Sequence, residues 1–293
     1  DALVGVGGGS TLDVAKAVSV LVANEGPALD YRGFDLIRNS GIPVIAVPTT
    51  AGSGSEVTPN ASFVDRQTKR KMGINTERYL PKLAVLDPRL TASCPVSVTV
   101  CCGMDALGHA IEGYVATGSS PMSRLFSKKA FALIFNNLRR ACGEPDDLKW
   151  RSRVQLGATY AMIGMMNSGA GPASAFSYPV GVHFGVPHGL AGGVFLAEVV
   201  AVNVEAGAGV YAPLYAVIEE ADKSGGSENY SARFVEQLRD LARELDVPVN
   251  LGALGIAKED CGVIREEVLK LNLDQNPVLF GEDEVDTVLE RLV

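Results

Sequence analysis

The segment Cys102–Glu112 (CGMDALGHAIE) places an acid and an imidazole at helical spacing. Asp105 and His109 are four residues apart, so on a helix both side chains lie on one face. A carboxylate oxygen and an imidazole nitrogen together suit a divalent transition metal. A pair at this spacing is more often a surface pair or a helix cap. Here the neighbouring residues are small or apolar, which indicates a buried face, and a buried charge needs a partner such as a metal.

A glycine-rich loop, Gly5–Ser10 (GVGGGS), joins an apolar run to a helical pattern. Glycines let the backbone approach a pyrophosphate closely, and a helix N-terminus offers N–H groups and the positive end of the helix dipole. We predict Ser10 as the N-cap and Asp13 in the first turn. The alternative is a purely structural turn, and the glycine run alone does not decide between the two.

A second candidate segment, residues 48–58 (PTTAGSGSEVT), also follows an apolar run directly. Small hydroxyl side chains at the carboxyl end of a strand suit contacts to ribose and phosphate, because ligands of open α/β sheets bind there. A hydroxyl-rich turn with helix caps is the alternative, and it is favoured if this segment is taken alone.

Taken together, GGGSTLDVAK (residues 7–16) and PTTAGSGSEVT closely resemble the GGGSxxDxAK and PTTAGTGSEVT motifs of the iron-containing (group III) alcohol dehydrogenase family. The resemblance extends from Ala2 to Val293. It implies NAD or NADP as cofactor and a divalent metal, with iron(II) as the first choice and zinc as the second. The cofactor-binding residues that the resemblance implies are Gly7, Gly8, Gly9, Ser10, Asp13, Thr49, Thr50, Ser53, Lys71 and Leu90. For Lys71, a solvated surface charge without a cofactor contact is an equal alternative.

The same resemblance implies a metal centre in the second half of the chain. Residues 187–189 (PHG) match the family motif whose histidine is a metal ligand, so His188 joins Asp105 and His109 as the implied ligand set. Two positions depart from the family. Ser174 stands where another ligand histidine is usual, and Tyr178 stands at the family's proton-relay position, where a packed tyrosine is an equal alternative. Metal binding is therefore expected to be weakened, altered in identity or lost.

Three further interpretations remain open at this stage. Ser177-Tyr178 and Tyr31–Leu36 (YRGFDL) are similar to the branch of 3-deoxy-octulosonate 8-oxidases, which act on a sugar acid's terminal alcohol, although that branch keeps a histidine at position 174. Another enzyme on the same scaffold, similar to glycerol dehydrogenase or dehydroquinate synthase, is the second. A metal-free nucleotide-binding relative without dehydrogenase activity is the third. His183 is a possible substitute ligand, but it does not lie at the family's ligand position, and a surface or core role is favoured for it.

The elements that must position these residues fall into two groups. Residues 2–6, 43–48 and 83–86 are continuous apolar runs, typical of a parallel sheet covered by helices, and residues 61–65 and 71–74 are predicted to pair as a hairpin. Helical periodicity dominates after Pro95. We predict an α/β, Rossmann-like nucleotide-binding domain over residues 1–93, truncated at its start because the chain opens directly on a strand. An all-α metal and substrate domain follows over residues 94–293, in a dehydroquinate synthase-like architecture. The predicted helices span residues 10–23, 103–115, 123–140, 149–166, 189–205, 211–220, 231–245, 258–270 and 283–292.

Composition sets outer limits on function. The 293 residues favour two domains, and the net charge of -8 argues against a nucleic-acid partner. Five cysteines without a C-x-x-C pair favour a reducing cytoplasm over a disulfide framework. No segment reads as a membrane span or a signal peptide. The expected partners are a small alcohol or aldehyde substrate and further copies of the chain in a homodimer or higher homo-oligomer.

Overall fold

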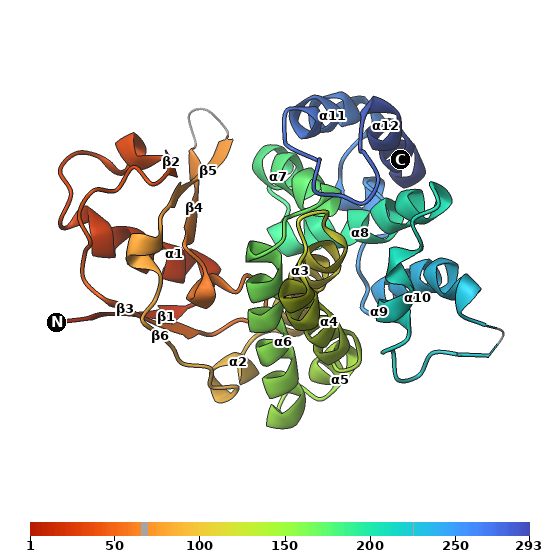
Figure 1. The fold of residues 1–293 in the computed structure, drawn as a ribbon, viewed down its shortest axis with the longest axis horizontal. Coiled ribbons are helices and arrows are strands. Elements are labelled where there is room, and N and C mark those ends of the chain that lie inside the picture. The colour runs from red at the N-terminus through yellow and green to blue at the C-terminus, as the bar shows by residue number, and fades with distance from the viewer. Residues whose placement is uncertain (66–69, 225) are drawn as a thin grey trace.

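The structure is a computed structural model that describes residues 1–293 except 66–69 and 225, with only the backbone for residues 70–72. An α/β part and a helical part lie side by side, with α6 and α3 on the side of the helical part that faces the sheets (Figure 1). This order, α/β followed by all-α, confirms the predicted fold class.

The first sheet has the strand order β1-β3-β6, with every pair parallel as predicted. It consists of β1 (Leu3–Gly7), β3 (Val44–Pro48) and β6 (Leu83–Ala84). The register runs from Leu3 opposite Val44 to Gly7 opposite Pro48, so β1 and β3 end level with each other. The loops that follow these two strands, which carry the two predicted cofactor motifs, therefore start from one edge of the sheet.

Two details of this sheet differ from the prediction. β6 is only two residues long, shorter than residues 83–86. The expectation that β1 is buried on both faces is wrong, because Val4 and Val6 are 55% and 54% exposed. β1 is an edge strand, and it faces α1 (Gly9–Leu21) through Gly5, where an added Cβ would lie 2.9 Å from Ala15 Cβ. Its valines point to the opposite face.

The second sheet lies on the other side of α1 and has the order β2-β5-β4. Its strands are β2 (Gly33–Phe34), β4 (Asn60–Asp65) and β5 (Arg70–Asn75). The predicted hairpin is confirmed, since β4 and β5 pair antiparallel from Asn60 opposite Asn75 to Asp65 opposite Arg70. A small core of Ala17, Val20, Ile37, Ala61, Ile74 and Tyr79 joins α1 to this sheet.

The helical part is built around α3 and α8, whose inner faces belong to one continuous apolar core. Leu107 of α3, Phe131 of α4 and Phe195 of α8 are among its fully buried side chains. The helices are α2 (Arg89–Ala92), α3 (Val96–Val115), α4 (Pro121–Phe135), α5 (Leu138–Gly143), α6 (Leu148–Met166), α7 (Pro172–Phe184), α8 (His188–Glu205), α9 (Ala212–Tyr215), α10 (Tyr230–Glu244), α11 (Cys261–Leu269) and α12 (Glu282–Leu292).

Several predicted helix bounds were wrong. Residues 123–140 form two helices, α4 and α5, which are separated at Asn136 and Asn137. Asparagine competes with the helix by bonding nearby backbone, and the Asn137 amide does so by donating to Leu133 O at 2.8 Å. Residues 211–220 contain only the short α9 and a 3-10 turn, and α11 begins at Cys261 after another such turn.

Within the part of the chain that the structure describes, α8 alone is long and apolar enough to cross a membrane by length and composition. Of that stretch, 67% is buried inside the protein. The central position of α8 in the core accounts for its composition, as in many core helices.

Candidate functional site

The glycine loop leads directly into α1, whose N-cap is Gly8 and not Ser10. The carbonyl of Gly8 accepts hydrogen bonds from Thr11 N at 3.0 Å and Leu12 N at 3.1 Å. The predictions of Ser10 as N-cap and of Asp13 in the first turn are therefore wrong, because the N-cap lies two residues earlier and the helix begins at Gly9. No side chain caps this helix. The first N–H groups of a helix have no partner within it and can bind an anion.

The two predicted cofactor motifs meet at this helix start. A Cβ at Gly9 would lie 2.5 Å from Ser53 Oγ, and one at Gly8 would lie 3.4 Å from Thr50 Oγ1. Thr49 N donates to Gly7 O at 2.9 Å. Only glycine at position 9 leaves room for Ser53, so the sequence brings backbone N–H groups and the hydroxyls of Thr50 and Ser53 to one place at the carboxyl ends of β1 and β3.

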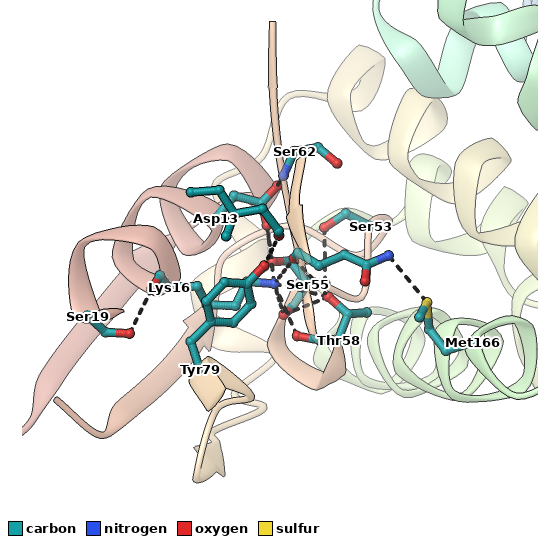
Figure 2. A network of polar contacts seen from close by, with 11 residues as sticks. Asp13, Lys16, Ser19, Ser53, Ser55, Thr58, Ser62, Tyr79 and Met166 are labelled. Carbon is teal, nitrogen blue, oxygen red and sulfur yellow. Dashed lines mark hydrogen bonds and ion pairs between the residues drawn. The ribbon is translucent and has the colours of Figure 1, made fainter. Parts of the chain in front are cut away.

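Asp13 links α1 to the second motif and to the second sheet (Figure 2). Its Oδ1 accepts from Ser55 Oγ at 2.6 Å and its Oδ2 accepts from Ser62 N at 2.9 Å. Lys16 Nζ lies 3.3 Å from Oδ1. The structure thus places this predicted cofactor residue in a bridge between elements.

Lys16 lies at the centre of the same network and is fully buried (Figure 2). Its ammonium group donates to Ser55 O at 2.9 Å, to Thr58 Oγ1 at 3.0 Å and to Asn60 O. Burial lowers the pKa of Lys16, and the nearby Asp13 carboxylate opposes this shift. Lys16 was not predicted as a functional residue, although it is the last residue of the first motif.

Two predicted cofactor residues lie away from these contacts. Leu90 is in α2 and is 38% exposed. Its neighbour Thr91 lines a small cavity together with Thr50 and Cys94, so α2 lies beside the second motif. Lys71 belongs to β5, and its side chain is outside the described residues.

The three predicted metal ligands lie together where α3 meets the start of α8. Asp105 Oδ1 is 3.5 Å from His109 Nε2 and 3.9 Å from His188 Nε2. A Cβ at Gly189 would lie 2.2 Å from Cys101 O and 2.7 Å from Asp105 Cβ. Glycine at position 189 therefore allows the first turn of α8 to approach α3 and brings His188 to Asp105.

These residues fit a divalent metal in donor type and in spacing around Asp105. Donors of a tetrahedral ion with bonds of about 2.1 Å lie about 3.4 Å apart, close to both distances above. His109 is 6% exposed, and its Nδ1 is buried without a hydrogen-bond partner. In the described residues, however, no three or more His, Cys, Asp or Glu side chains already converge as a metal site.

Position 174, where the resemblance implies a ligand histidine, carries a serine that is bonded to a buried acid. Ser174 Oγ donates to Glu112 Oε2 at 2.5 Å, and Ser174 N donates to Oε1 at 3.1 Å. Burial raises the pKa of Glu112, and the bonds from Ser174 oppose this shift. Glu112 was not predicted as a site residue. Its spacing of seven residues from Asp105, on the same helix face, was the available signal.

α7 carries both positions that depart from the family, and the sequence analysis predicted no helix there. Ser177 Oγ lies 2.9 Å from His188 Nδ1 and donates to Ser174 O at 2.5 Å. The Tyr178 ring packs against the His188 ring in a tilted arrangement, with 5.3 Å between the ring centroids. Burial, together with the charges of Asp105 and Glu112, raises the pKa of Tyr178.

Tyr178 also faces a cleft of about 590 Å³ between the second sheet and helices α7 and α11. Phe34, Asn60 and Ser62 line it from the sheet side, and His183 lines it from α7. Tyr178 is 37% exposed. It therefore lies between the open cleft on one side and the Asp105, His109 and His188 group on the other.

Known proteins match this arrangement over nearly the entire chain. Residues 1–88 match the model of the family described as iron-containing alcohol dehydrogenase, and residues 99–293 match the model of the C-terminal part of the same family. The chain belongs to the iron-containing alcohol dehydrogenase family. Members are oxidoreductases that use NAD(P) and a divalent metal and act on small alcohols or aldehydes.

Individual relatives of this dehydrogenase family share about a third of the residues. The chain is 32% identical over 270 residues to an NAD-dependent methanol dehydrogenase of Bacillus methanolicus, covering 92% of this chain and 71% of the relative. It is 31% identical over 294 residues to a sulfoacetaldehyde reductase of Bilophila wadsworthia, covering 99% and 76%. A solved 1,3-propanediol oxidoreductase superposes with a TM-score of 0.93 at 29% identity, covering 99% of this chain and 76% of that one.

Proposed function

We propose that the protein catalyses metal-assisted hydride transfer between an alcohol and an aldehyde or ketone, with NAD or NADP as the hydride carrier. The observation that carries this proposal is the position of Asp105. Its carboxylate lies beside two imidazoles and behind Tyr178, which opens onto the cleft. Family membership supports the reaction class.

In this proposal the start of α1 binds the cofactor's pyrophosphate. Gly7, Gly8, Gly9 and Ser10 supply backbone N–H groups, while Thr49, Thr50 and Ser53 contact the adenosine and nicotinamide portions. Asp13 acts by holding the second motif against α1, as its bonds to Ser55 and Ser62 support. Lys71 and Leu90 complete the proposed contacts.

Asp105, His109 and His188 would hold the metal. When bound, a divalent ion polarises the substrate oxygen and favours the alkoxide form of an alcohol. Ser177 orients the His188 ring through its contact with Nδ1. Tyr178 keeps its proton at neutral pH because the pKa of a phenol is about 10, and its phenol can donate to the substrate oxygen as an aldehyde is reduced.

We further propose iron(II) as the metal, with zinc as the alternative, and a division of labour at Ser93 between a nucleotide-binding part (residues 1–93) and a metal and substrate part (residues 94–293). A cytoplasmic location and a homo-oligomer complete the proposal. A sugar-acid alcohol is one candidate substrate, motivated by Ser177-Tyr178 and residues 31–36. Relatives named for methanol and for sulfoacetaldehyde match at nearly equal identity, so they favour no single substrate.

The test is alcohol oxidation, followed by NADH or NADPH absorbance in the purified, metal-loaded protein. Asp105→Ala and His188→Ala should lose bound metal and lower turnover by at least about a hundredfold, because each removes one of three ligands. His183→Ala is the matched control for metal content, since it removes a histidine that lies outside the group, and it should keep the metal. Full activity in both ligand variants would refute the site.

A metal-free nucleotide-binding relative is the second candidate. Ser174 and the incomplete convergence of the described donors favour it. Metal analysis decides between the two, because a purified protein with stoichiometric iron or zinc excludes the metal-free reading. A folded protein that binds NAD but takes up no metal excludes the dehydrogenase proposal.

A further inference from the structure

Helix α3 presents two carboxylates and one imidazole on a single face. Asp105, His109 and Glu112 are spaced at i, i+4 and i+7, which places all three within about one sixth of a helical turn. The Asp105 side chain is 16% exposed, and Glu112 is 4% exposed. Asp105 pairs only with the two histidines, and Glu112 has no Lys or Arg partner within the described residues. Buried carboxylates need a counter-charge.

The structure around Ser174 is built to hold the Glu112 carboxylate. Ser174 contributes two hydrogen bonds, one from its hydroxyl and one from its backbone N–H. A Cβ at Gly171 would lie 2.8 Å from Glu112 Oε1, so only glycine admits the carboxylate here. The Ser174 hydroxyl is thereby committed to Glu112.

Glu112 nevertheless retains capacity for further contacts. A carboxylate offers about four lone-pair sites, and the two hydrogen bonds from Ser174 occupy two of them. Ser174 O accepts from Ser177 Oγ, which lies 2.9 Å from His188 Nδ1, so two serines link the Glu112 carboxylate to His188. The unpartnered His109 Nδ1 lies on the same face of α3.

We propose that Glu112 supplies to the metal the protein donor that position 174 lacks, so that the centre has two carboxylates and two imidazoles. This inference rests on the proposed metal-dependent function. A divalent ion would balance both carboxylate charges, which no described Lys or Arg does. Replacing an imidazole by a carboxylate adds a hard oxygen donor and moves metal preference from zinc toward iron(II) and manganese(II).

The experiment is a double-mutant cycle on the complete chain with Zn²⁺ as the probe. Wild type, E112Q, S174H and the double variant E112Q/S174H are stripped of metal, and Zn²⁺ affinity is measured by competition with a chromophoric chelator. E112Q should weaken binding at least about tenfold in the wild-type background, because a neutral amide is a poor ligand. In the S174H background, where an imidazole supplies the donor, the loss should fall below about threefold. The absorption spectrum of the Co²⁺-loaded protein should change on E112Q substitution in the wild-type background and stay unchanged in the S174H background.

A residue that merely anchors α7 would behave differently, since losing the anchor would cost the same affinity in both backgrounds. Equal losses, or unchanged Zn²⁺ affinity in E112Q, therefore overturn this inference and leave the proposed function standing. A folded wild type that binds no Zn²⁺ or Fe²⁺ overturns both.

E198Q is the matched control, because Glu198 is also a largely buried acid, with 13% of its side chain exposed, and it pairs with Arg239 at 2.9 Å. It should leave Zn²⁺ affinity unchanged. NAD binding and circular dichroism verify that each variant is folded. If E112Q does not fold, E112D keeps the charge on a side chain one methylene shorter, and it should also weaken Zn²⁺ binding.

Discussion

Lys16 is a charged side chain without exposed surface, and the second cofactor motif is folded around it. The ammonium group donates to carbonyl oxygens of Ser55, in a 3-10 turn, and of Asn60, at the start of β4. Because Asp13 is bonded to Lys16 and to two serines at once, the first motif fixes the position of the second. A conserved spacing of motifs in a family can therefore reflect mutual support as much as ligand contact.

Lys16→Met should destabilise the fold by about 3–5 kcal/mol, since it removes one partner of a buried ion pair and leaves carbonyl groups unpaired. NAD affinity should fall with it, because the loop around Ser53 loses its support. Urea unfolding and NAD titration measure the two effects. Lys129→Met, at an exposed position of α4, is the control and should change neither. An unaltered unfolding midpoint in Lys16→Met would contradict the role assigned to this lysine.

Cys102 illustrates how burial sets reactivity. Burial, with the nearby Cys101 and Asp105, raises the pKa of the Cys102 thiol from 9.0 to about 12. At pH 8 its thiolate fraction should then be about a thousandfold lower in the folded protein than in the unfolded chain. Iodoacetamide labelling followed by mass spectrometry, in buffer and in urea, measures this ratio for each cysteine. Fast labelling of Cys102 in the folded protein at pH 8 would contradict the burial argument.

Single residues were predicted from the sequence with uneven success. Motif residues such as Gly9 and Ser53 meet as expected, because strand ends in a parallel sheet lie at one edge. The roles of Lys16 and Glu112 were missed, since each depends on partners far away in the sequence. Ser10 was misassigned because a glycine N-cap carries no side-chain signal.

Among the elements, α7 and α8 deliver the side chains that surround Asp105. α7 starts with Pro172 at its first turn, contains Pro179, and ends at Gly185 with a φ of 71°. Prolines and glycines normally punctuate loops, which is why the sequence pattern concealed this helix. The strongly amphipathic helices α10 and α12 were located to within one residue at each end. Elements with ordinary composition could thus be predicted, and the one that carries the unusual site residues could not.

The contact between α3 and α8 gives a prediction with an internal control. Gly189→Ala would place a Cβ 2.2 Å from the Cys101 carbonyl oxygen, so α8 must move away from α3 and carry His188 with it. We expect about 1–3 kcal/mol of destabilisation and a loss of metal affinity. Gly192→Ala, on the same helix, meets nothing closer than 3.7 Å and should be neutral or slightly stabilising. Thermal unfolding and metal titration of the two variants test the contact, and similar behaviour of both would refute it.

Across the whole molecule, two apolar cores of very different size are joined by polar contacts. The core of the helical part is continuous from α3 to α12, whereas the α/β part relies on a small core and on the Lys16 network. Thr159 of α6 donates to Glu56 at 2.7 Å, and Gln155 of α6 donates to Pro48 O at 3.4 Å. These bonds tie the second cofactor motif to the helical part, so the position of the cofactor relative to the metal group is set by α6.

Metal removal should therefore separate binding from chemistry. Neither core nor the Lys16 network includes Asp105, His109 or His188, so the chelated protein should keep its helical circular dichroism and bind NAD within about threefold of the loaded protein. The metal should add about 4 kcal/mol of stability at a thousandfold excess over its Kd, which corresponds to a Tm shift of roughly 8–16 °C. Calorimetry, NAD titration and turnover on the same chelated and reloaded samples measure all three. Turnover should vanish with the metal and return with it, because only the chemical step needs the ion. Unfolding on chelation, or loss of NAD binding, would show instead that the metal holds the two parts together.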